Sequence, residues 1–428
     1  MALRIKGSRF SHSRCTNPAM WLDFATAELS AEEFQQRREQ ARRSGSPSWL
    51  WPEVQVGEWA AAMAQLCAAV GTVLAGTRAD LPEIEPMSLS LACYTSGVGP
   101  LLGFWLEKRQ LDAPAQAGAL LALHLEHARR RATRVEVQSR EMVGGLVDCG
   151  VPLVVLKGGH TSYGYFPEPA TRPSSDFDLL VPRDFSTQAE VALAKAGLEC
   201  VQRSKRDSTW MSPGTWRWPR SIWLAHADDP WSVDLHNSLD FSASAGAPLL
   251  WFDCADPIET SGPWPLDDSA GVLSQPLLLL HLAVHAGGGL HSLTLLRMIE
   301  IVLVARQDTG NGSLSWDDFL HLGAATNALG VAYPALRMAE KLAPGTIPSR
   351  VMEISAELAP PRAHAVVDKL VPATAQRVDR ASIAEHFMWV AGMSGWARQL
   401  FSDLAPRSDF WEIYRARAHR LLRGQVSR

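Results

Sequence analysis

Apolar residues recur at helical spacing through about the first 140 residues of the chain. The periodicity is clear in 58–74 and again in 115–146, where alanine and leucine dominate. A charged stretch at 126–134 follows the leucines of the second segment, and the cluster Arg129-Arg130-Arg131 is expected on a solvated helix face rather than at a phosphate. The pattern predicts a helical N-terminal region over residues 1–140.

The hydrophobic pattern changes at Gly150. The short, β-branched run Val151–Leu156 is typical of a buried strand. Three further strands are predicted, at Leu179–Val181, Ile222–His226 and Ser232–Asn237. These runs predict a small module with a mixed sheet.

One helix is predicted between the strands of this module. Thr187 and Glu190 have the spacing of a capping box, which would begin a helix that runs through Lys195. Gly197 is placed to end it. The module therefore combines strands and a helix over residues 141–262.

The region 263–428 returns to helical spacing. Ser274 can cap a helix, and Pro276 fits an early helical position. Further helices are predicted at 277–286, 293–306, 316–322, 333–342 and 409–422. The expected fold class is α+β, with a small mixed-sheet module flanked by N-terminal and C-terminal helical regions.

Composition narrows the class of protein. A chain of 428 residues is long enough for two or three domains. The net charge of −4 gives no general attraction to long nucleic acid or to anionic membranes. The basic N-terminus lacks the apolar core of a signal peptide, and the longest apolar run, near Pro276–Ala286, is shorter than the ~20 residues of a membrane span. Six scattered cysteines without a CxxC pair are expected to be reduced, so we predict a cytoplasmic protein without membrane partners.

Two acidic residues, Asp176 and Asp178, stand at i and i+2 in the run Pro173–Val181. On an extended strand both point to one side of a sheet, and Phe177 points to the other. The two carboxylates repel each other, so a cation is expected between them. Carboxylate oxygens suit hard divalent ions such as Mg²⁺ or Mn²⁺, which predicts a metal site.

Several other residues around this strand suit phosphoryl chemistry. Gly158-Gly159 follows the first strand and is expected to form a turn whose amides approach a phosphate, although the pair fits a plain turn equally well. Lys157 and Arg172 are nearby cations. Asp234 lies on a later strand that can pair with the strand of Asp176 and Asp178. Together they suit two metal ions roughly 3.5–4 Å apart, with the cations neutralising a triphosphate.

Histidines near these residues allow two interpretations. His160 follows the glycine pair, and His236 shares a strand face with Asp234, so each could touch substrate or a carboxylate, or could be structural. His281 and His285 lie at i and i+4 of an apolar helix. No Glu follows His281, so they are expected to be buried, hydrogen-bonded histidines rather than a zinc pair.

A tryptophan- and arginine-rich stretch at 203–231 separates the expected strands. Trp216, Arg217 and Trp218 stand in its middle. Aromatic and basic side chains could stack a nucleobase or an acceptor. The same stretch could equally be a β-hairpin whose tryptophans pack on the edge of the module.

The order of these features resembles the DNA polymerase β-type nucleotidyltransferase superfamily. That pattern is a strand and Gly-Gly, then Asp-x-Asp in an apolar strand, then a third aspartate on a later strand. Longer matches resemble one bacterial family within it, the uncharacterised nucleotidyltransferases. These matches are Leu156-Lys-Gly, Tyr165-Phe-Pro, Arg172 before Asp176-Phe-Asp-Leu-Leu-Val, Val233-Asp-Leu-His236, Leu278–His285 and Ser315-Trp-Asp-Asp318.

The resemblance places five residues on the motif positions of the superfamily, namely Gly158, Gly159, Asp176, Asp178 and Asp234. Two departures concern the glycine pair: its second position is Gly rather than Ser, and its distance along the chain to Asp176 is longer than in many members.

The resemblance implies an enzyme that transfers an NMP group from an NTP, with Mg²⁺, to a hydroxyl or amine. Members often occur in natural-product gene clusters, including those for lasso peptides, which implies a small-molecule or peptide acceptor and a biosynthetic partner protein. Two alternatives remain: kinase-like transfer of the γ-phosphoryl group at the same site, and a non-catalytic nucleotide-binding or scaffold protein. We expect Asn at Asp176 or Asp178 to abolish turnover without harming the fold, because like charges are removed.

Overall fold

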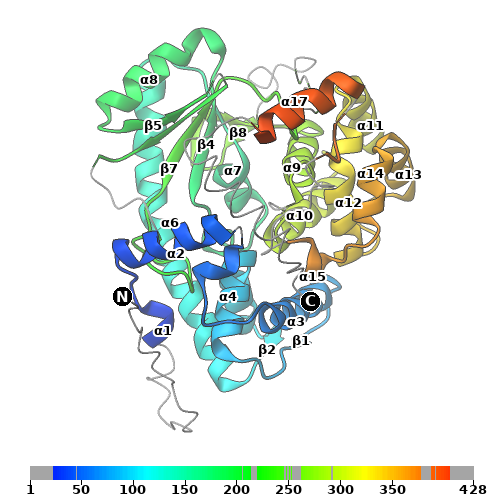
Figure 1. Cartoon of the computed structure of the whole chain (residues 1–428). Coiled ribbons are helices and arrows are strands. Elements are labelled where there is room, and N and C mark those ends of the chain that lie inside the picture. The colour runs from blue at the N-terminus through cyan, green and yellow to red at the C-terminus, as the bar shows by residue number, and fades with distance from the viewer. Residues whose placement is uncertain are drawn as a thin grey trace.

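A seven-stranded mixed sheet lies among helices from both ends of the chain (Figure 1). The computed structural model describes residues 23–44, 46–204, 206–213, 219–244, 247, 250, 252, 262–290, 293–376, 387–390 and 392–404. The α+β class predicted from the sequence is confirmed.

The strands of this sheet run in the order β5-β6-β7-β4-β3-β9-β8. Their bounds are β3 Val154–Val155, β4 Asp176–Leu180, β5 Glu199–Arg203, β6 Asp207–Met211, β7 Ser232–His236, β8 Gly262–Trp264 and β9 Asp267–Val272. The central strand β4 pairs parallel with β7 and antiparallel with β3. Strands β8 and β9 follow residue 261 in the chain, yet they extend the same sheet.

Alternation along the strands gives the sheet one apolar face. Phe177 and Leu179 of β4, and Val233 and Leu235 of β7, all point into one buried cluster. Helices α6 (Ala115–Asp148) and α8 (Ser186–Lys195) cover that face, and their apolar side chains complete the cluster. The polar residues of the same strands are left on the opposite face.

The N-terminal region is helical, as predicted. Besides α6 it contains α1 Asp23–Thr26, α2 Ala31–Ser44, η2 Pro47–Leu50, α3 Val56–Leu74, α4 Pro86–Ser96 and α5 Gly99–Glu107. Two short strands, β1 (Ala79–Asp80) and β2 (Leu111–Asp112), pair in parallel outside the main sheet.

Helix α3 is long and apolar enough to cross a membrane by length and composition, and α4 with α5 would meet the same criterion only as a pair bent by 108°. In the fold, α3 buries one stripe that includes Trp59, Met63 and Leu66. Its opposite side carries exposed alanines and Gln65. This one-sided burial is that of a helix packed on a protein core.

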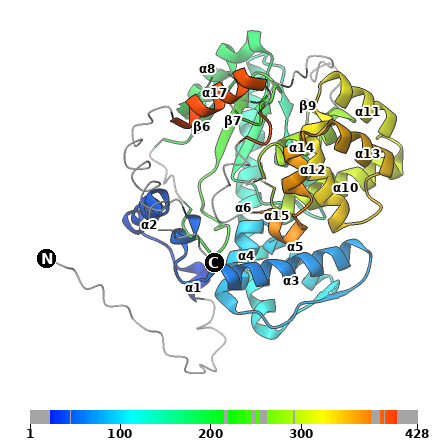
Figure 2. The ribbon, with the colours of Figure 1, turned by 45° about the vertical axis from the view of Figure 1, so that its right-hand side comes forward.

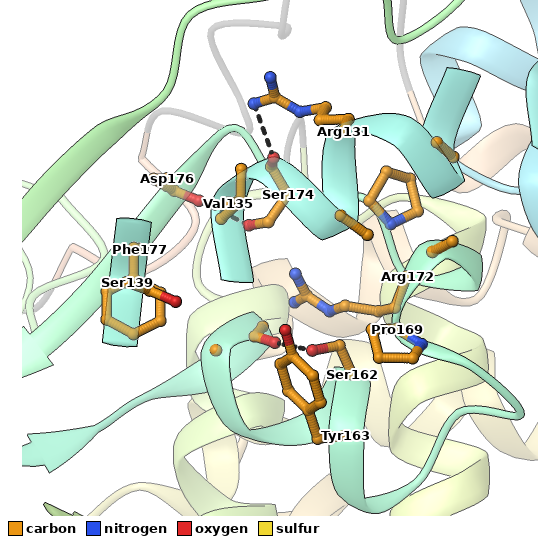
Figure 3. A pocket seen from close by; sticks show the side chains of 16 residues that line it. Arg131, Val135, Ser139, Ser162, Tyr163, Pro169, Arg172, Ser174, Asp176 and Phe177 are labelled. Atoms are coloured by element: carbon orange, nitrogen blue, oxygen red, sulfur yellow. Dashed lines mark hydrogen bonds between the residues drawn. The ribbon is translucent and has the colours of Figure 1, made fainter. Parts of the chain in front are cut away.

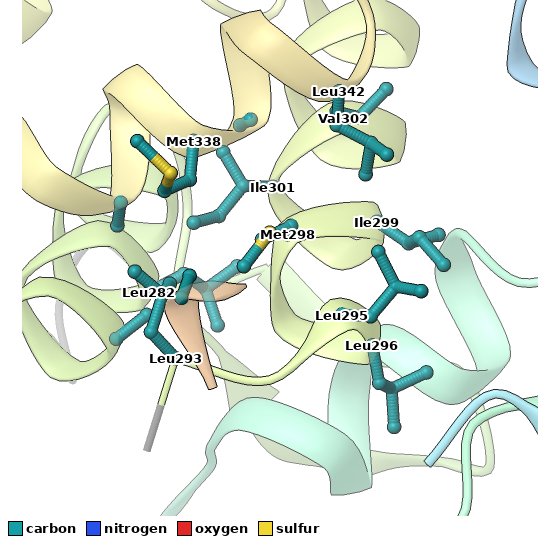
Figure 4. Close-up of a cluster of buried hydrophobic side chains, with 14 of the residues drawn as sticks. Leu282, Leu293, Leu295, Leu296, Met298, Ile299, Ile301, Val302, Met338 and Leu342 are labelled. Atoms are coloured by element: carbon teal, nitrogen blue, oxygen red, sulfur yellow. The ribbon is translucent and has the colours of Figure 1, made fainter. Parts of the chain in front are cut away.

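The C-terminal region is also helical, and its apolar side chains join those of the N-terminal helices in one large core. Its helices are α9 Leu277–Gly287, α10 Leu295–Asn311, α11 Trp316–Ala325, α12 Leu329–Leu342, α13 Ser349–Leu358, α14 Pro361–Val367, α15 Pro372–Ala375 and α17 Gly392–Leu404. Figure 4 shows side chains of α9, α10 and α12, among them Leu282, Ile301 and Met338, meeting in this core. Helix α15 lies beside α3 from the other end of the chain (Figure 2).

Some predictions of local structure were wrong. Gly158-Gly159 is not a turn but part of the first turn of helix α7, which runs from Lys157 to Gly164. Residues 222–226 form no strand, because Ile222 and Trp223 are buried in an irregular segment against the helical core. Helix α8 begins at Ser186, and no side chain caps it, so the predicted capping box does not form.

Strands β5, β6, β8 and β9 of the main sheet were missed, and β6 lies between β5 and β7. Strand β9 and most of β8 fall in the region 263–428, which was predicted to be helical. Two short helical turns, η3 (Pro169–Thr171) and η4 (Arg183–Phe185), flank β4. The helix predicted at 409–422 falls outside the described residues.

Candidate functional site

Adjacent parallel strands bring three aspartates together on the polar face of the sheet. Asp176 and Asp178 are two residues apart on β4, and Asp178 is directly opposite Asp234 on β7. One carboxylate oxygen of each residue lies within 4.8 Å of those of the other two. The predicted pairing of the two strands is therefore present, and it gathers the three carboxylates at one point.

Two cationic or hydrogen-bonding side chains surround the central carboxylate. Lys157 Nζ lies 2.8 Å from Asp178 Oδ1, and His236 Nε2 lies 2.9 Å from the same oxygen. Burial alone would raise the pKa of Asp178, but Lys157 and His236 outweigh burial and hold that pKa far below its usual range. His236 thus contacts Asp178 across the strands rather than orienting its strand neighbour Asp234.

The pKa of Asp234 is shifted in the opposite direction. Burial raises its pKa, the Thr209 hydroxyl opposes this, and the negative charges of Asp178 and Asp176 raise the pKa further. Its Oδ1 atom is buried and has no hydrogen-bond partner among the described residues. A buried, unpartnered carboxylate oxygen costs free energy unless a ligand meets it. The three carboxylates therefore fit a divalent cation such as Mg²⁺ or Mn²⁺.

The first aspartate is held from the loop before β4. Ser174 Oγ donates to Asp176 Oδ1 at 2.9 Å, and the Ser174 carbonyl accepts from Arg131 at 3.1 Å. Arg131 is buried and also donates to the carbonyls of Asp229 and Pro230. The prediction of a solvated face was therefore wrong for Arg131, which ties the loop before β4 to the loop before β7.

Helix α7 begins at the site with close backbone packing. Lys157 has a left-handed φ of 42°, which costs roughly 1–3 kcal/mol for a residue with a side chain. A Cβ atom on Gly158 would lie 2.1 Å from Arg172 Nη1, and one on Gly159 would lie 2.7 Å from Phe177. The Gly159 carbonyl accepts from the indole of Trp264 at 2.8 Å. Glycine is required here so that the helix can approach β4 and Arg172.

Arg172 lies at the site but is already paired. Its Nε and Nη2 atoms donate to the two oxygens of Glu300, at 3.0 and 3.1 Å. Burial alone would lower the pKa of Arg172, but Glu300 outweighs burial and raises it. Glu300 also accepts from the Thr161 hydroxyl of α7. This buried pair joins α7 to α10, and no sequence motif indicated Glu300.

His160 is buried one turn into α7 and packs edge-on against Tyr165, with ring centroids 5.6 Å apart. Burial lowers its pKa to about 4. It does not line either of the two pockets described next, so its predicted contact with phosphate has no geometric support.

Two pockets adjoin the start of α7. The first, the α6–α7 pocket, lies between those helices and the loop before β4 (Figure 3). Its walls are mostly apolar and include Ala132, Val135 and the Tyr163 ring. Asp176 lies at its edge, next to the metal-ligand candidates.

The second, the α7–α9–α10 pocket, lies on the C-terminal side. Its lining consists of Lys157, Arg172, Leu282, His285, Arg297 and Glu300. Four of these six residues carry a formal charge, a larger share than in the lining of the α6–α7 pocket. Nothing in the sequence pointed to Arg297, because only the packing of α10 against α7 brings it to the site.

The tryptophan- and arginine-rich stretch is described in part. Trp216, Arg217 and Trp218 lie outside the described residues, so their predicted role near the acceptor stays a prediction. Trp210 and Trp223 are buried in the two cores, and Trp231 packs edge-on against Phe177 at 6.2 Å. Trp210 and Trp231 therefore pack beside the sheet as in the structural interpretation, whereas Trp223 packs in the large core of the helical regions. Strands β5 and β6 form a hairpin, but only β6 lies fully within 203–231.

Comparison with known families yields one match. A model of the family described as "Uncharacterised nucleotidyltransferase" matches residues 83–344. The matched segment runs from the start of α4 to the end of α12 and so contains the whole sheet and both pockets. No curated protein and no solved structure matches the chain.

Proposed function

We propose that this chain, which belongs to the family of uncharacterised nucleotidyltransferases, transfers an NMP group from an NTP. The acceptor group is a hydroxyl, or an amine, of a small molecule or a peptide. Two observations on one cluster carry the proposal. Carboxylate oxygens of Asp176, Asp178 and Asp234 lie within 4.8 Å of one another, and the buried Asp234 Oδ1 has no hydrogen-bond partner among the described residues. In the reaction the acceptor oxygen forms a bond to the α-phosphorus. The bond from that phosphorus to the bridging oxygen breaks, and pyrophosphate leaves.

The three aspartates would hold Mg²⁺ or Mn²⁺. When bound, the metal supplies positive charge at the α-phosphate and lowers the pKa of the acceptor hydroxyl. Asp234, whose pKa is already raised, is placed to accept the acceptor proton or to ligate the cation. Lys157 lies beside the carboxylates and would neutralise charge on the phosphates.

The two pockets suggest how the nucleotide lies. Asp176 lines the α6–α7 pocket, and Lys157, bonded to Asp178, lines the α7–α9–α10 pocket. A nucleotide with its α-phosphate at the aspartates would place its base between the apolar walls of the first pocket. The acceptor would approach from the Asp234 side, where β6 and β7 pair.

The proposed acceptor class rests on the resemblance to proteins of natural-product clusters, which also suggests a biosynthetic partner protein. The net charge of −4 favours a small molecule or a peptide over a long nucleic acid.

An isotope experiment tests the proposed transfer. The full chain would be incubated with Mg²⁺, a cell extract and ATP labelled at the α or at the γ position. We expect α label, and the mass of a nucleotidyl group, on an acceptor. Transfer of γ label alone would show kinase-like chemistry instead, and failure to bind Mg²⁺–NTP in calorimetry would favour a scaffold.

A further inference from the structure

The α7–α9–α10 pocket contains buried nitrogen atoms that no described residue satisfies. Arg297 Nη1, His285 Nδ1 and His281 Nε2 are all buried without a hydrogen-bond partner. Arg297 and His285 line the pocket, and the ring of His281 lies on α9 with its centroid 5.7 Å from that of His285, tilted by 60°. Three such atoms near one cavity indicate a missing ligand, because buried polar groups are normally paired.

The charges around the cavity indicate the sign of that ligand. Among the residues that line the pocket, the one acid, Glu300, is paired with Arg172, and Lys157 is paired with Asp178 of β4, so Arg297 is the lining cation left without a carboxylate of its own. Arg297 forms no ion pair with any described residue, and its guanidinium keeps its charge. The cavity therefore has one uncompensated positive charge.

The two histidines add hydrogen bonding without adding charge. Burial lowers the pKa of His281 to about 3 and the pKa of His285 well below its usual range, so both rings are neutral near pH 7. A neutral imidazole has one N–H donor. Arginine, lysine and imidazole donors around one cavity suit the oxygens of a phosphate.

We propose that the α7–α9–α10 pocket binds the two terminal phosphates of the NTP, and then the leaving pyrophosphate, through Arg297, His285 and Lys157. The identity of the ligand rests on the proposed function, whereas the observation of unpartnered nitrogen atoms is independent of it. The C-terminal helices α9 and α10 thus complete a substrate site that the sheet begins. Arg297 is the specificity residue that would distinguish a triphosphate from a monophosphate.

Calorimetry on the full chain with Mg²⁺ tests this assignment. Pyrophosphate, ATP and AMP would be titrated into the wild type, Arg297→Gln and a matched control, Arg350→Gln. Arg350 lies on α13, where it pairs with Asp317 at an exposed position. We expect Arg297→Gln to weaken pyrophosphate and ATP about 10- to 100-fold, the effect of losing a charged hydrogen bond, and to leave AMP unchanged. Arg350→Gln should bind all three like the wild type.

Two further variants keep the test decisive if Arg297→Gln does not fold. Arg297→Lys retains the charge and should bind pyrophosphate with intermediate affinity, because a lysine cannot reproduce the planar fork of donors. His285→Asn should weaken pyrophosphate by a smaller factor than Arg297→Gln. Wild-type pyrophosphate affinity in the folded variants would overturn the assignment.

The result of the calorimetry can be distinguished from the result of the label-transfer experiment that tests the proposed function. Arg297-dependent binding of pyrophosphate without any label transfer would support the phosphate pocket and count against nucleotidyl transfer. Label transfer with an unchanged KM for ATP in Arg297→Gln would support the transferase and remove the phosphate pocket.

Discussion

The two pockets beside the start of α7 differ in how their polar groups are satisfied. In the α6–α7 pocket, Arg131 donates to backbone carbonyls, Ser162 donates to the Gly158 carbonyl, and Ser174 donates to Asp176. In the α7–α9–α10 pocket, Arg297 and His285 each retain a buried nitrogen that no residue in the described part of the chain contacts by a hydrogen bond. The polar groups named for the first pocket are paired within the protein, whereas in the second Arg297 forms no ion pair with any described residue.

This difference indicates which forces would hold each part of a nucleotide. Satisfied polar groups and apolar walls offer shape and contact area, which suit a base. Unpartnered donors and an uncompensated charge offer electrostatic attraction, which suits phosphates. The aspartate cluster lies between the two, so the difference predicts that substitutions on the two sides will affect different ligands.

Asp178→Asn should have the largest effect, because it breaks the charge balance on the phosphate side. The substitution leaves the partly buried Lys157 without its carboxylate, which should destabilise the fold by about 3–5 kcal/mol. Turnover should fall by at least a factor of ~100, as for the loss of one electrostatic contact to the reacting group. Urea unfolding and the α-label assay measure the two effects.

This expectation corrects the one drawn from the sequence. Repulsion between carboxylates suggested that Asn at Asp178 would not harm the fold, but the structure pairs Asp178 with two partners. If Asp178→Asn unfolds at the same urea concentration as the wild type, Lys157 does not need its carboxylate partner. That result would weaken the contrast drawn between the two pockets.

Asp234→Asn should separate activity from stability. Asp234 is half-buried, its pKa is raised, and its buried Oδ1 has no hydrogen-bond partner among the described residues, so the neutral amide removes an unfavourable charge. We expect a melting temperature equal to or above that of the wild type and a loss of turnover of about 100-fold or more. A marked fall in melting temperature would contradict the assignment of Asp234 as an unsatisfied group.

The pH dependence of stability should have opposite signs for Asp178 and Asp234. The pKa of Asp178 is depressed by folding, so its contribution is present above the unfolded value of about 3.9 and is lost as the pH falls towards the folded pKa. The pKa of Asp234 is raised, so its effect has the opposite sign: protonation favours the fold, and stability falls as the pH rises through its folded pKa.

Urea unfolding between pH 3 and pH 7 measures both contributions. The deficit of Asp178→Asn relative to the wild type should shrink as the pH is lowered through ~3.9, because the unfolded wild type then binds a proton at Asp178 that the folded wild type does not bind, and the variant has no such carboxyl. The gain of Asp234→Asn should likewise shrink at low pH, where the wild-type carboxyl is neutral. Differences that do not change with pH would assign both effects to packing.

Much of the sheet side of the site could be predicted from the sequence. A period of two places Asp176 and Asp178 on one face, and the apolar residues around Asp234 mark a neighbouring strand. These patterns are local, and β4 and β7 realise them. The resemblance in the same segments was confirmed by the family match over residues 83–344.

The helix side could not be predicted, because it depends on tertiary packing. Arg297 and Glu300 read as ordinary polar positions of an amphipathic helix, and only the docking of α10 on α7 brings them to the site. Gly158-Gly159 read as a turn for a related reason. The requirement for glycine comes from the approach of Arg172 and Phe177 and not from the local backbone, since both residues lie in a helix.

Gly158→Ala should affect both pockets, because Arg172 lines each of them. The added methyl group would lie 2.1 Å from Arg172 Nη1, so the guanidinium must move away from Glu300. We expect a loss of stability of ~1–3 kcal/mol and weaker binding of ATP and of pyrophosphate. Gly144→Ala on α6 is the matched control, since nothing lies within 4 Å of its Cβ, and it should be neutral or stabilising.

Ala132→Leu should have the smallest and most selective effect. Ala132 is a half-buried residue in the wall of the α6–α7 pocket and does not line the α7–α9–α10 pocket. The larger side chain occupies space that we assign to the base, so ATP affinity should fall by a factor of ~10, whereas overpacking rarely abolishes a fold. Pyrophosphate affinity, measured by the same calorimetry, should not change, because that ligand never reaches α6. An equal loss for both ligands would mean that the two pockets act as one, and the division between shape on one side and charge on the other would be wrong.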